Sequence, residues 1–416
     1  MQQITDRAKE DKIPALWRLA FRPGFLLSAI FAVLSIVLWI YWLETGNSVI
    51  GLEAQKEFSP QWWHGHEMLF GFGLPVVIGF LLTAVQTWTN IPGTRHYRLM
   101  AIFGCWLFAR VVLIIPADLQ IPNNLILAMV ADTLFIALGI YELFIRVWAR
   151  KQWHNLAFIP ILLVFAGLNI TSYVQADSNG SGVFGRHTNF HYSAMMLYAL
   201  LLTVMGGRVI PFFTARRLNL QQADKLKWLE ITCIALTVIT VILAASGLLA
   251  GDFLKEGSQT VQALLLITAG IHLTRQARWH SLKTGGVPLL WSLHLSYLCI
   301  PVTLALLAFN LDNPIAIKNL MHLLGIGAIG GMIIAMMARV SLGHTGRSLD
   351  IKTDVVFALA LVLMAGLIRS VLPTIYPELT LWAFRLSALC WIVGFGLFLK
   401  TYAPMYLKAR VDGRPG

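Results

Sequence analysis

The sequence is poor in charged residues. Asp, Glu, Lys and Arg make up 12% of the 416 residues, whereas 57% are hydrophobic, and the mean hydropathy is +0.70. A soluble domain carries about 25% charged residues. The composition therefore excludes an ordinary soluble enzyme and predicts an all-α integral membrane protein.

Cysteine is also scarce, and several catalytic motifs are missing. The four cysteines, Cys105, Cys233, Cys299 and Cys390, stand singly in separate apolar stretches, where a packing role is the usual one. We find no Walker loop and no nucleophile elbow. These absences weaken the case for nucleotide-driven transport or for hydrolysis.

Long apolar runs fill most of the chain. Since a membrane-spanning helix needs about 20 mostly apolar residues, we predict about 12 transmembrane helices in one polytopic membrane domain, residues 1–416. They are Pro23–Leu43, Glu67–Thr89, Tyr97–Ile115, Asn123–Val147, Trp153–Tyr173, Phe190–Phe212, Trp228–Leu249, Gln259–Thr274, Val287–Phe309, Ala316–Leu342, Asp354–Val371 and Thr380–Tyr402.

The basic residues gather in alternate loops, as the positive-inside rule requires. One side receives nearly all of the loop lysines and arginines, and the other has only Lys56, Arg186, Lys255 and Lys318. Residues 1–22 and 403–416 are therefore predicted to be cytoplasmic tails. The net charge of +12 comes from basic residues that are spread along one face of the lipid bilayer and set the topology. They form no patch interleaved with aromatic residues that would suit a nucleic acid.

Histidines recur with a period that suggests three pseudo-repeats of four helices. His64, His191 and His322 open the second helix of each group, and both His191 and His322 precede an Arg-Val pair by seventeen residues. These pairs are Arg208-Val209 and Arg339-Val340. We expect helices 2, 6 and 10 to face one another at the centre of the bundle.

The predicted topology places four histidines at the outer ends of helices 2, 6 and 10: His64, His66, His191 and His322. A neutral imidazole is a common ligand for copper and haem iron, so these four are the candidate metal ligands. The alternative is that each is an interfacial polar residue. Glu67, beside His66, is a candidate hydrogen-bond partner of a ligand or a proton relay.

Four further residues are weaker candidates for holding a cofactor. His294 lies within helix 9, and His344 lies at the inner end of helix 10. Each is either a ligand or a satisfied core histidine. Arg208 and Arg339 are candidates for pairing with haem propionates, although both also suit the cytoplasmic boundary of their helices.

Two acidic residues lie in helix 4. Asp132 and Glu142 are ten residues apart, roughly 15 Å along a helix axis. Carboxylates inside a membrane are candidates for a proton path. Hydrogen bonding to a neighbouring helix is the equal alternative.

Several motifs together resemble the NnrS family of bacterial membrane proteins. They are Phe21-Arg22-Pro23, Trp63-His64-Gly65-His66-Glu67-Met68-Leu69-Phe70-Gly71, Gly206-Gly207-Arg208-Val209-Ile210-Pro211-Phe212-Phe213-Thr214, Leu293-His294-Leu295, Gly327-Ala328-Ile329-Gly330-Gly331-Met332, Arg339-Val340-Ser341-Leu342-Gly343-His344-Thr345-Gly346-Arg347 and Arg410-Val411-Asp412-Gly413-Arg414-Pro415-Gly416. The resemblance extends along most of the chain.

The resemblance implies a haem- and copper-containing protein of the bacterial cytoplasmic membrane, linked to nitric oxide, nitrosative stress and denitrification. The leading hypothesis is binding of nitric oxide, extending to a reductase-like oxidoreductase that takes electrons from a quinol. The alternatives are a transporter of a metal, haem or small molecule, and a membrane sensor of nitric oxide. A transporter would be favoured by repeats of inverted topology, whereas four-helix units repeat in parallel.

Overall fold

The computed structural model of the chain describes residues 10–46, 59–114, 123–177, 190–247 and 258–414. Within these ranges every regular element is a helix, which confirms the all-α prediction. The longer helices are α2 (Phe21–Thr45), α3 (Pro60–His66), η3 (Glu67–Gly73), α4 (Leu74–Thr89), α5 (Tyr97–Ile114), α6 (Asn124–Ala149), α7 (Phe158–Asp177), α8 (Phe190–Arg217), α9 (Lys227–Ala245), α10 (Ser258–Ala277), α11 (Pro288–Ala308), α12 (Pro314–His322), η7 (Leu323–Gly330), α13 (Gly331–His344), α14 (Thr353–Ser370), α15 (Leu372–Ile375) and α16 (Thr380–Tyr406).

The predicted number of spans agrees with the structure, with one exception. Eleven helical spans among the described residues are long and apolar enough to cross a membrane. The helix that does not qualify is α10, the eighth, whose buried polar residues His272, Arg275 and Gln276 lower its hydropathy. The predicted helix ends Ile115 and Leu249, and the basic residues Lys56, Arg186 and Lys255, lie outside the described residues.

Helices 2 and 10 begin earlier than predicted. Proline suits a first helical turn, where its missing N–H costs nothing, and both helices start on one, at Pro60 and Pro314. The side chains of Ser59 and Asn313 cap them by accepting hydrogen bonds from the backbone N–H groups of Trp62 and Ala316. His64 therefore lies inside α3, and does not open the helix.

The terminal tails are shorter than predicted, because the first and last helices extend further. Helix α2 begins at Phe21 and α16 continues to Tyr406. Arg22 connects the two helices, since its Nη1 donates to the carbonyl oxygens of Tyr406 and Lys408 at 2.9 and 2.8 Å. Tyr406 is the last residue of α16, where carbonyl oxygens have no partner within the helix.

Helices 2 and 10 share an irregularity, a change from α to π winding directly after a histidine. The π segments are η3, after His66, and η7, after His322. A π turn misaligns the regular backbone hydrogen bonds. Side chains satisfy two of the affected carbonyls in η3: Trp106 Nε1 donates to Gly71 O at 2.9 Å, and Ser28 Oγ donates to Phe72 O at 2.6 Å.

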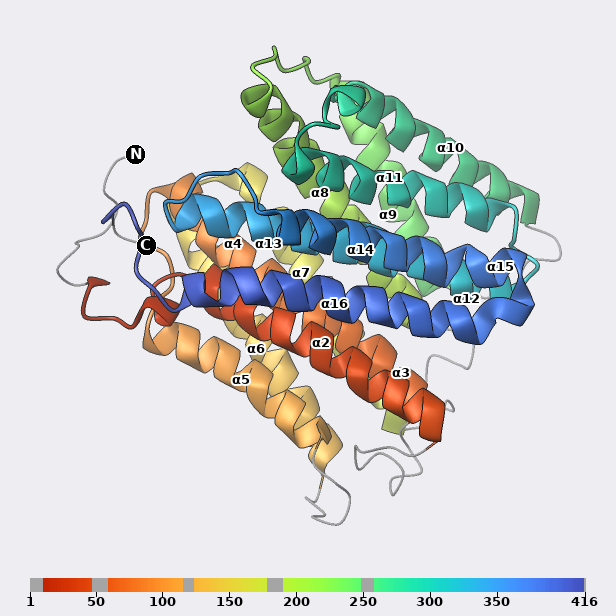
Figure 1. Cartoon of the computed structure of the whole chain (residues 1–416), viewed down its shortest axis with the longest axis horizontal. Coiled ribbons are helices and arrows are strands. Elements are labelled where there is room, and N and C mark those ends of the chain that lie inside the picture. Colours follow the sequence, from red (N-terminus) through yellow and green to blue (C-terminus); the bar gives the residue numbers. More distant parts are fainter. Residues whose placement is uncertain (1–9, 47–58, 115–122, 178–189, 248–257, 415–416) are drawn as a thin grey trace. The chain divides into compact units, whose positions relative to one another are not determined.

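The chain packs as two compact units. The first comprises Met1–Val183, Met337–Asp350 and Phe395–Gly416. In it α2 packs on α4 and η3, and α6 packs on both α5 and α7 (Figure 1). The C-terminal residues also belong to this unit: Arg410 donates to His344 O at 2.7 Å, and its hydrogen bond to Asp412 lowers the pKa of that carboxyl to about 2.

The second unit comprises Phe184–Met336 and Ile351–Gly394. In it α8 packs on α9, α10 on α11, and α14 on η7 (Figure 1). A Cβ added at Gly366 of α14 would lie 2.8 Å from the backbone N of Gly327 in η7. Glycine at this position lets the two helix backbones approach closely.

The spans predicted as helices 2, 6 and 10 are the most buried among those described. They are Pro60–Thr89, Phe190–Arg217 and Pro314–His344. In their most apolar stretches 83%, 72% and 78% of the residues are buried, whereas no other span exceeds 61%. Most of the residues in these three stretches are therefore covered by other parts of the protein. That the three helices face one another at the centre of the bundle stays a prediction.

The spacing of the helix starts also supports an internal repeat that relates the first and third groups of four helices. The third helices, α5 and α14, begin 256 residues apart at Tyr97 and Thr353, and the fourth helices, α6 and α16, begin 256 residues apart at Asn124 and Thr380. Together with the shared π segments, this regular offset is what an internal repeat produces.

Candidate functional site

A cluster of charged and polar side chains lies buried in the first unit, at the predicted outer ends of its helices. Helix 2 supplies His66 and Glu67, α5 supplies Arg110 and α6 supplies Asp132. All four are at most 2% exposed. Burying charges inside a membrane protein is costly, so such residues are usually retained for function.

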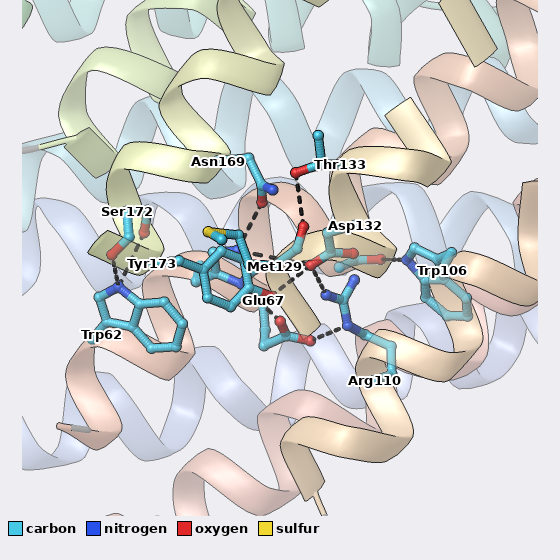
Figure 2. Close-up of polar contacts among 12 residues, drawn as sticks. Trp62, Glu67, Trp106, Arg110, Met129, Asp132, Thr133, Asn169, Ser172 and Tyr173 are labelled. Atoms are coloured by element: carbon cyan, nitrogen blue, oxygen red, sulfur yellow. Dashed lines mark hydrogen bonds and ion pairs between the residues drawn. The ribbon is translucent and has the colours of Figure 1, made fainter. Parts of the chain in front are cut away.

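Arg110 joins the two carboxylates (Figure 2). Its Nη2 donates to Asp132 Oδ2 in a short hydrogen bond. Its Nε lies 2.8 Å from Glu67 Oε2, but the N–H is not aligned on this oxygen, so the contact is an ion pair without a hydrogen bond. Tyr173 OH donates a second hydrogen bond to Asp132 Oδ2 at 2.7 Å.

His66 is hydrogen-bonded through both ring nitrogens. Nε2 lies 3.0 Å from Asn169 Oδ1, an acceptor, and therefore carries a hydrogen. Nδ1 lies 2.8 Å from Glu67 Oε1, and one proton must lie between these two atoms. A metal bound to His66 would require at least one of these bonds to break.

The cluster is electrically neutral when one proton lies between His66 and Glu67. Asp132 and Arg110 offset each other, and the His66–Glu67 pair is neutral only when it holds the extra proton, on either partner. Without this proton the buried cluster carries one net negative charge, which the low dielectric of the interior disfavours. The arrangement therefore fits one proton held between His66 and Glu67.

Aromatic rings enclose the proton-binding pair. Trp62 and Phe70 stack on His66 with ring centroids 4.8 and 4.9 Å away, and Tyr173 meets it edge-on at 4.7 Å. Trp62 is itself held by hydrogen bonds from Nε1 to Ser172 O and Oγ, both 3.0 Å (Figure 2).

The three remaining candidate metal ligands are distributed over both units. His64 belongs to the first unit and stacks on Trp39 at 4.3 Å. His191 and His322 belong to the second unit, on α8 and α12. A Cβ at Gly325 of η7 would lie 2.6 Å from Met195 Cε of α8, so these two helices touch about one turn after the two histidines.

His322 has a tautomer that suits metal binding. Its Nδ1 lies 2.8 Å from the carbonyl oxygen of Lys318 and so carries the hydrogen, which places the ring's lone pair on Nε2. Histidine ligands of metals commonly donate their second N–H to a carbonyl in this way. Among the described residues no group of three or more His, Cys, Asp or Glu side chains is positioned to hold a metal ion.

The weaker candidates are not brought into one cluster. His294 is buried, with Nε2 2.9 Å from Thr214 Oγ1 and Nδ1 2.8 Å from Ser281 Oγ, as in a satisfied core histidine. His344 packs against Phe21 with ring centroids 5.6 Å apart. Arg208 lies in the second unit and Arg339 in the first, so their roles toward a propionate stay predictions.

The two helix 4 carboxylates have different partners. Asp132 belongs to the buried cluster, whereas Glu142 pairs with Arg146 one turn later, at 2.6 Å, and with Arg98 at 3.2 Å. Glu142 also accepts a hydrogen bond from Thr94 at 2.9 Å. For Glu142 the structure therefore favours interhelical bonding over a proton path.

Sequence reasoning did not identify Arg110, Asn169 and Tyr173. Arg110 could have been found, because an arginine inside a predicted span is a signal in its own right. Asn169 and Tyr173 give no such signal, because amides and phenols are common in membrane helices.

Comparison with known proteins agrees with the motif resemblance. No curated protein matches the chain. The family model described as NnrS protein matches residues 15–410, nearly the whole chain. With its multi-pass helical fold and this match, the chain belongs to the NnrS family.

Proposed function

We propose that this protein binds haem and copper in the bacterial cytoplasmic membrane and binds nitric oxide there. Family membership fits a nitric oxide-related membrane protein. The observation that carries the proposal is that the three most buried spans are the three whose outer ends carry His64, His191 and His322. Polar side chains on central membrane helices usually mark functional sites.

The residues present suit haem better than a copper centre of several side chains. A haem iron needs one or two protein ligands, and the His322 tautomer directs a lone pair away from the helix backbone. When bound, the iron supplies a site that coordinates nitric oxide. His191, on the helix that touches η7, is the partner of His322 in this proposal.

The proton-binding pair suits a reductive extension of this function. Conversion of two nitric oxide molecules to nitrous oxide and water takes two electrons and two protons, which a quinol would supply. His66 and Glu67 hold one proton in a buried, neutral cluster at the same predicted depth as the candidate ligands. In this proposal they store and deliver the protons that the reaction consumes.

The test is an absorption spectrum and metal analysis of the purified protein and of single variants. His191→Ala and His322→Ala should each lower bound haem or copper while the protein stays folded, because neither side chain belongs to the fully buried core. His154→Ala, at an exposed position in a predicted cytoplasmic loop, is the matched control and should keep full content.

Two outcomes would contradict the proposal. If both variants keep full metal content and unchanged spectra, the ligands lie elsewhere. A wild-type protein with neither a Soret band nor copper would favour a transporter instead. The observation that supports a transporter is the buried His66–Glu67 pair, which would serve as a site for proton coupling.

A further inference from the structure

Arg369 is a buried arginine whose charge no neighbouring group offsets in the described part of the chain. Three other buried arginines of the helices contact a carboxylate, Arg110, Arg146 and Arg275, and Arg22 donates to backbone carbonyl oxygens at the end of α16. Arg369, near the outer end of α14 in the second unit, is 9% exposed. No acidic side chain among the described residues lies within 4.0 Å of its guanidinium.

The immediate partners of Arg369 are neutral. Nη1 donates to Asn319 Oδ1 on α12 at 2.9 Å, and Cζ lies 3.8 Å from the centroid of the Phe384 ring on α16. A guanidinium has five N–H donors in one plane, and this hydrogen bond uses one of them. Stacking on the Phe384 ring covers one face of the Arg369 guanidinium. The remaining N–H donors, which lie in the plane of the group, are left for a ligand.

The internal repeat shows what is missing at this position. In the first group of helices, Arg110 is neutralised by Glu67, the first residue of η3, and by Asp132, eight residues into α6. The corresponding positions in the third group are Leu323, the first residue of η7, and Ala388, eight residues into α16. The same offset of 256 residues pairs Arg110 with Gly366, so Arg369 lies three residues, about one helical turn, further along α14. Both carboxylate positions of the third group are apolar, although its third helix also carries a buried arginine.

An unneutralised guanidinium inside a membrane protein is strongly unfavourable, because the group cannot lose its charge. We propose that Arg369 binds a planar oxyanion, which takes the place that carboxylates occupy around Arg110. The planar donor edge of arginine matches a carboxylate or similar oxyanion with two parallel hydrogen bonds. The anion is either a free small ion or the carboxylate of a larger bound molecule.

The test measures anion-dependent thermal stability of the purified protein in detergent. Formate and nitrate should raise the melting temperature of the wild type saturably, and chloride at equal ionic strength should do so much less. Arg369→Gln should lose at least tenfold in apparent formate affinity. Arg385→Gln, an exposed arginine of the neighbouring α16, is the matched control and should respond as the wild type does.

A second variant keeps the proposal falsifiable if Arg369→Gln does not fold. Ala388→Asp places a carboxylate on α16 one helical turn after Phe384, the ring on which Arg369 stacks, and should fold but lose the formate response. If a larger molecule fills the site, free anions have no effect on the wild type, and mass spectrometry finds a carboxylate-bearing molecule in extracts of the wild type but not of Ala388→Asp. The proposal is overturned if neither a selective anion response nor such a molecule is found, or if Ala388→Asp keeps either one.

Discussion

Arg110 holds two carboxylates together in a part of the protein where each alone would be strongly unfavourable. Glu67 and Asp132 come from different helices, and both are at most 1% exposed. Neutrality of the cluster depends on Arg110 and on the proton shared by His66 and Glu67. At the residue scale, stability and proton binding therefore depend on the same side chains.

We expect Arg110→Gln to lower the free energy of unfolding by about 3–5 kcal/mol, because it removes the buried cation that neutralises Asp132 and pairs with Glu67. Thermal or denaturant unfolding in detergent measures the change. The double variant Arg110→Gln/Asp132→Asn should recover part of the loss, since it removes the charge of Asp132. Equal stability of Arg110→Gln and the wild type would show that the cluster is not buried as described.

At the scale of helices, glycines decide where polar side chains can lie between spans. Gly207 of α8 faces Arg275 of α10, and an added Cβ would overlap the guanidinium. That guanidinium pairs with Glu230 and donates to Tyr297 OH at 3.0 Å. The glycine therefore leaves room for an ion pair that links α9, α10 and α11.

We expect Gly207→Ala to displace Arg275 and to lower the free energy of unfolding by about 3 kcal/mol, because the buried Arg275 guanidinium loses its ion pair with Glu230. Gly270→Ala is the matched control on α10, since nothing lies within 4 Å of its added Cβ. The control should be neutral or slightly stabilising, as alanine is the better helix former. Equal melting temperatures for the two variants would contradict this packing argument.

At the scale of the whole molecule, the charge distribution predicts the orientation in the membrane. The basic loops and both termini are expected to face the cytoplasm, which places the loop between α14 and α16 outside and the loop between α10 and α11 inside. The depth assigned to all of the candidate ligands follows from this orientation.

Single cysteines in a variant without native cysteines test the orientation. We expect Glu378→Cys, in the loop before α16, to react with a membrane-impermeant maleimide in intact cells. Lys283→Cys, in the loop after α10, should react only after permeabilisation. Both positions are exposed, so accessibility of the thiol does not bias the result. The opposite labelling pattern would invert the topology.

The class of protein, nearly all of the spans and the family could be predicted from the sequence alone. Hydropathy and helix length are local properties, so α2 and α16 could be found to within a few residues of their ends. The early starts of helices 2 and 10 were missed, because capping by Ser59 and Asn313 lies before the apolar runs.

Which polar groups meet could be learned only from the packing of the helices. Glu67, Arg110 and Asp132 lie on three helices, and no spacing along the chain indicates that their side chains converge. Likewise, the sequence shows an arginine at position 369, but the absence of a carboxylate beside it among the described residues depends on how α12, α14 and α16 pack. Pairing of charges is a property of distances in space, and in this protein packing between helices sets those distances.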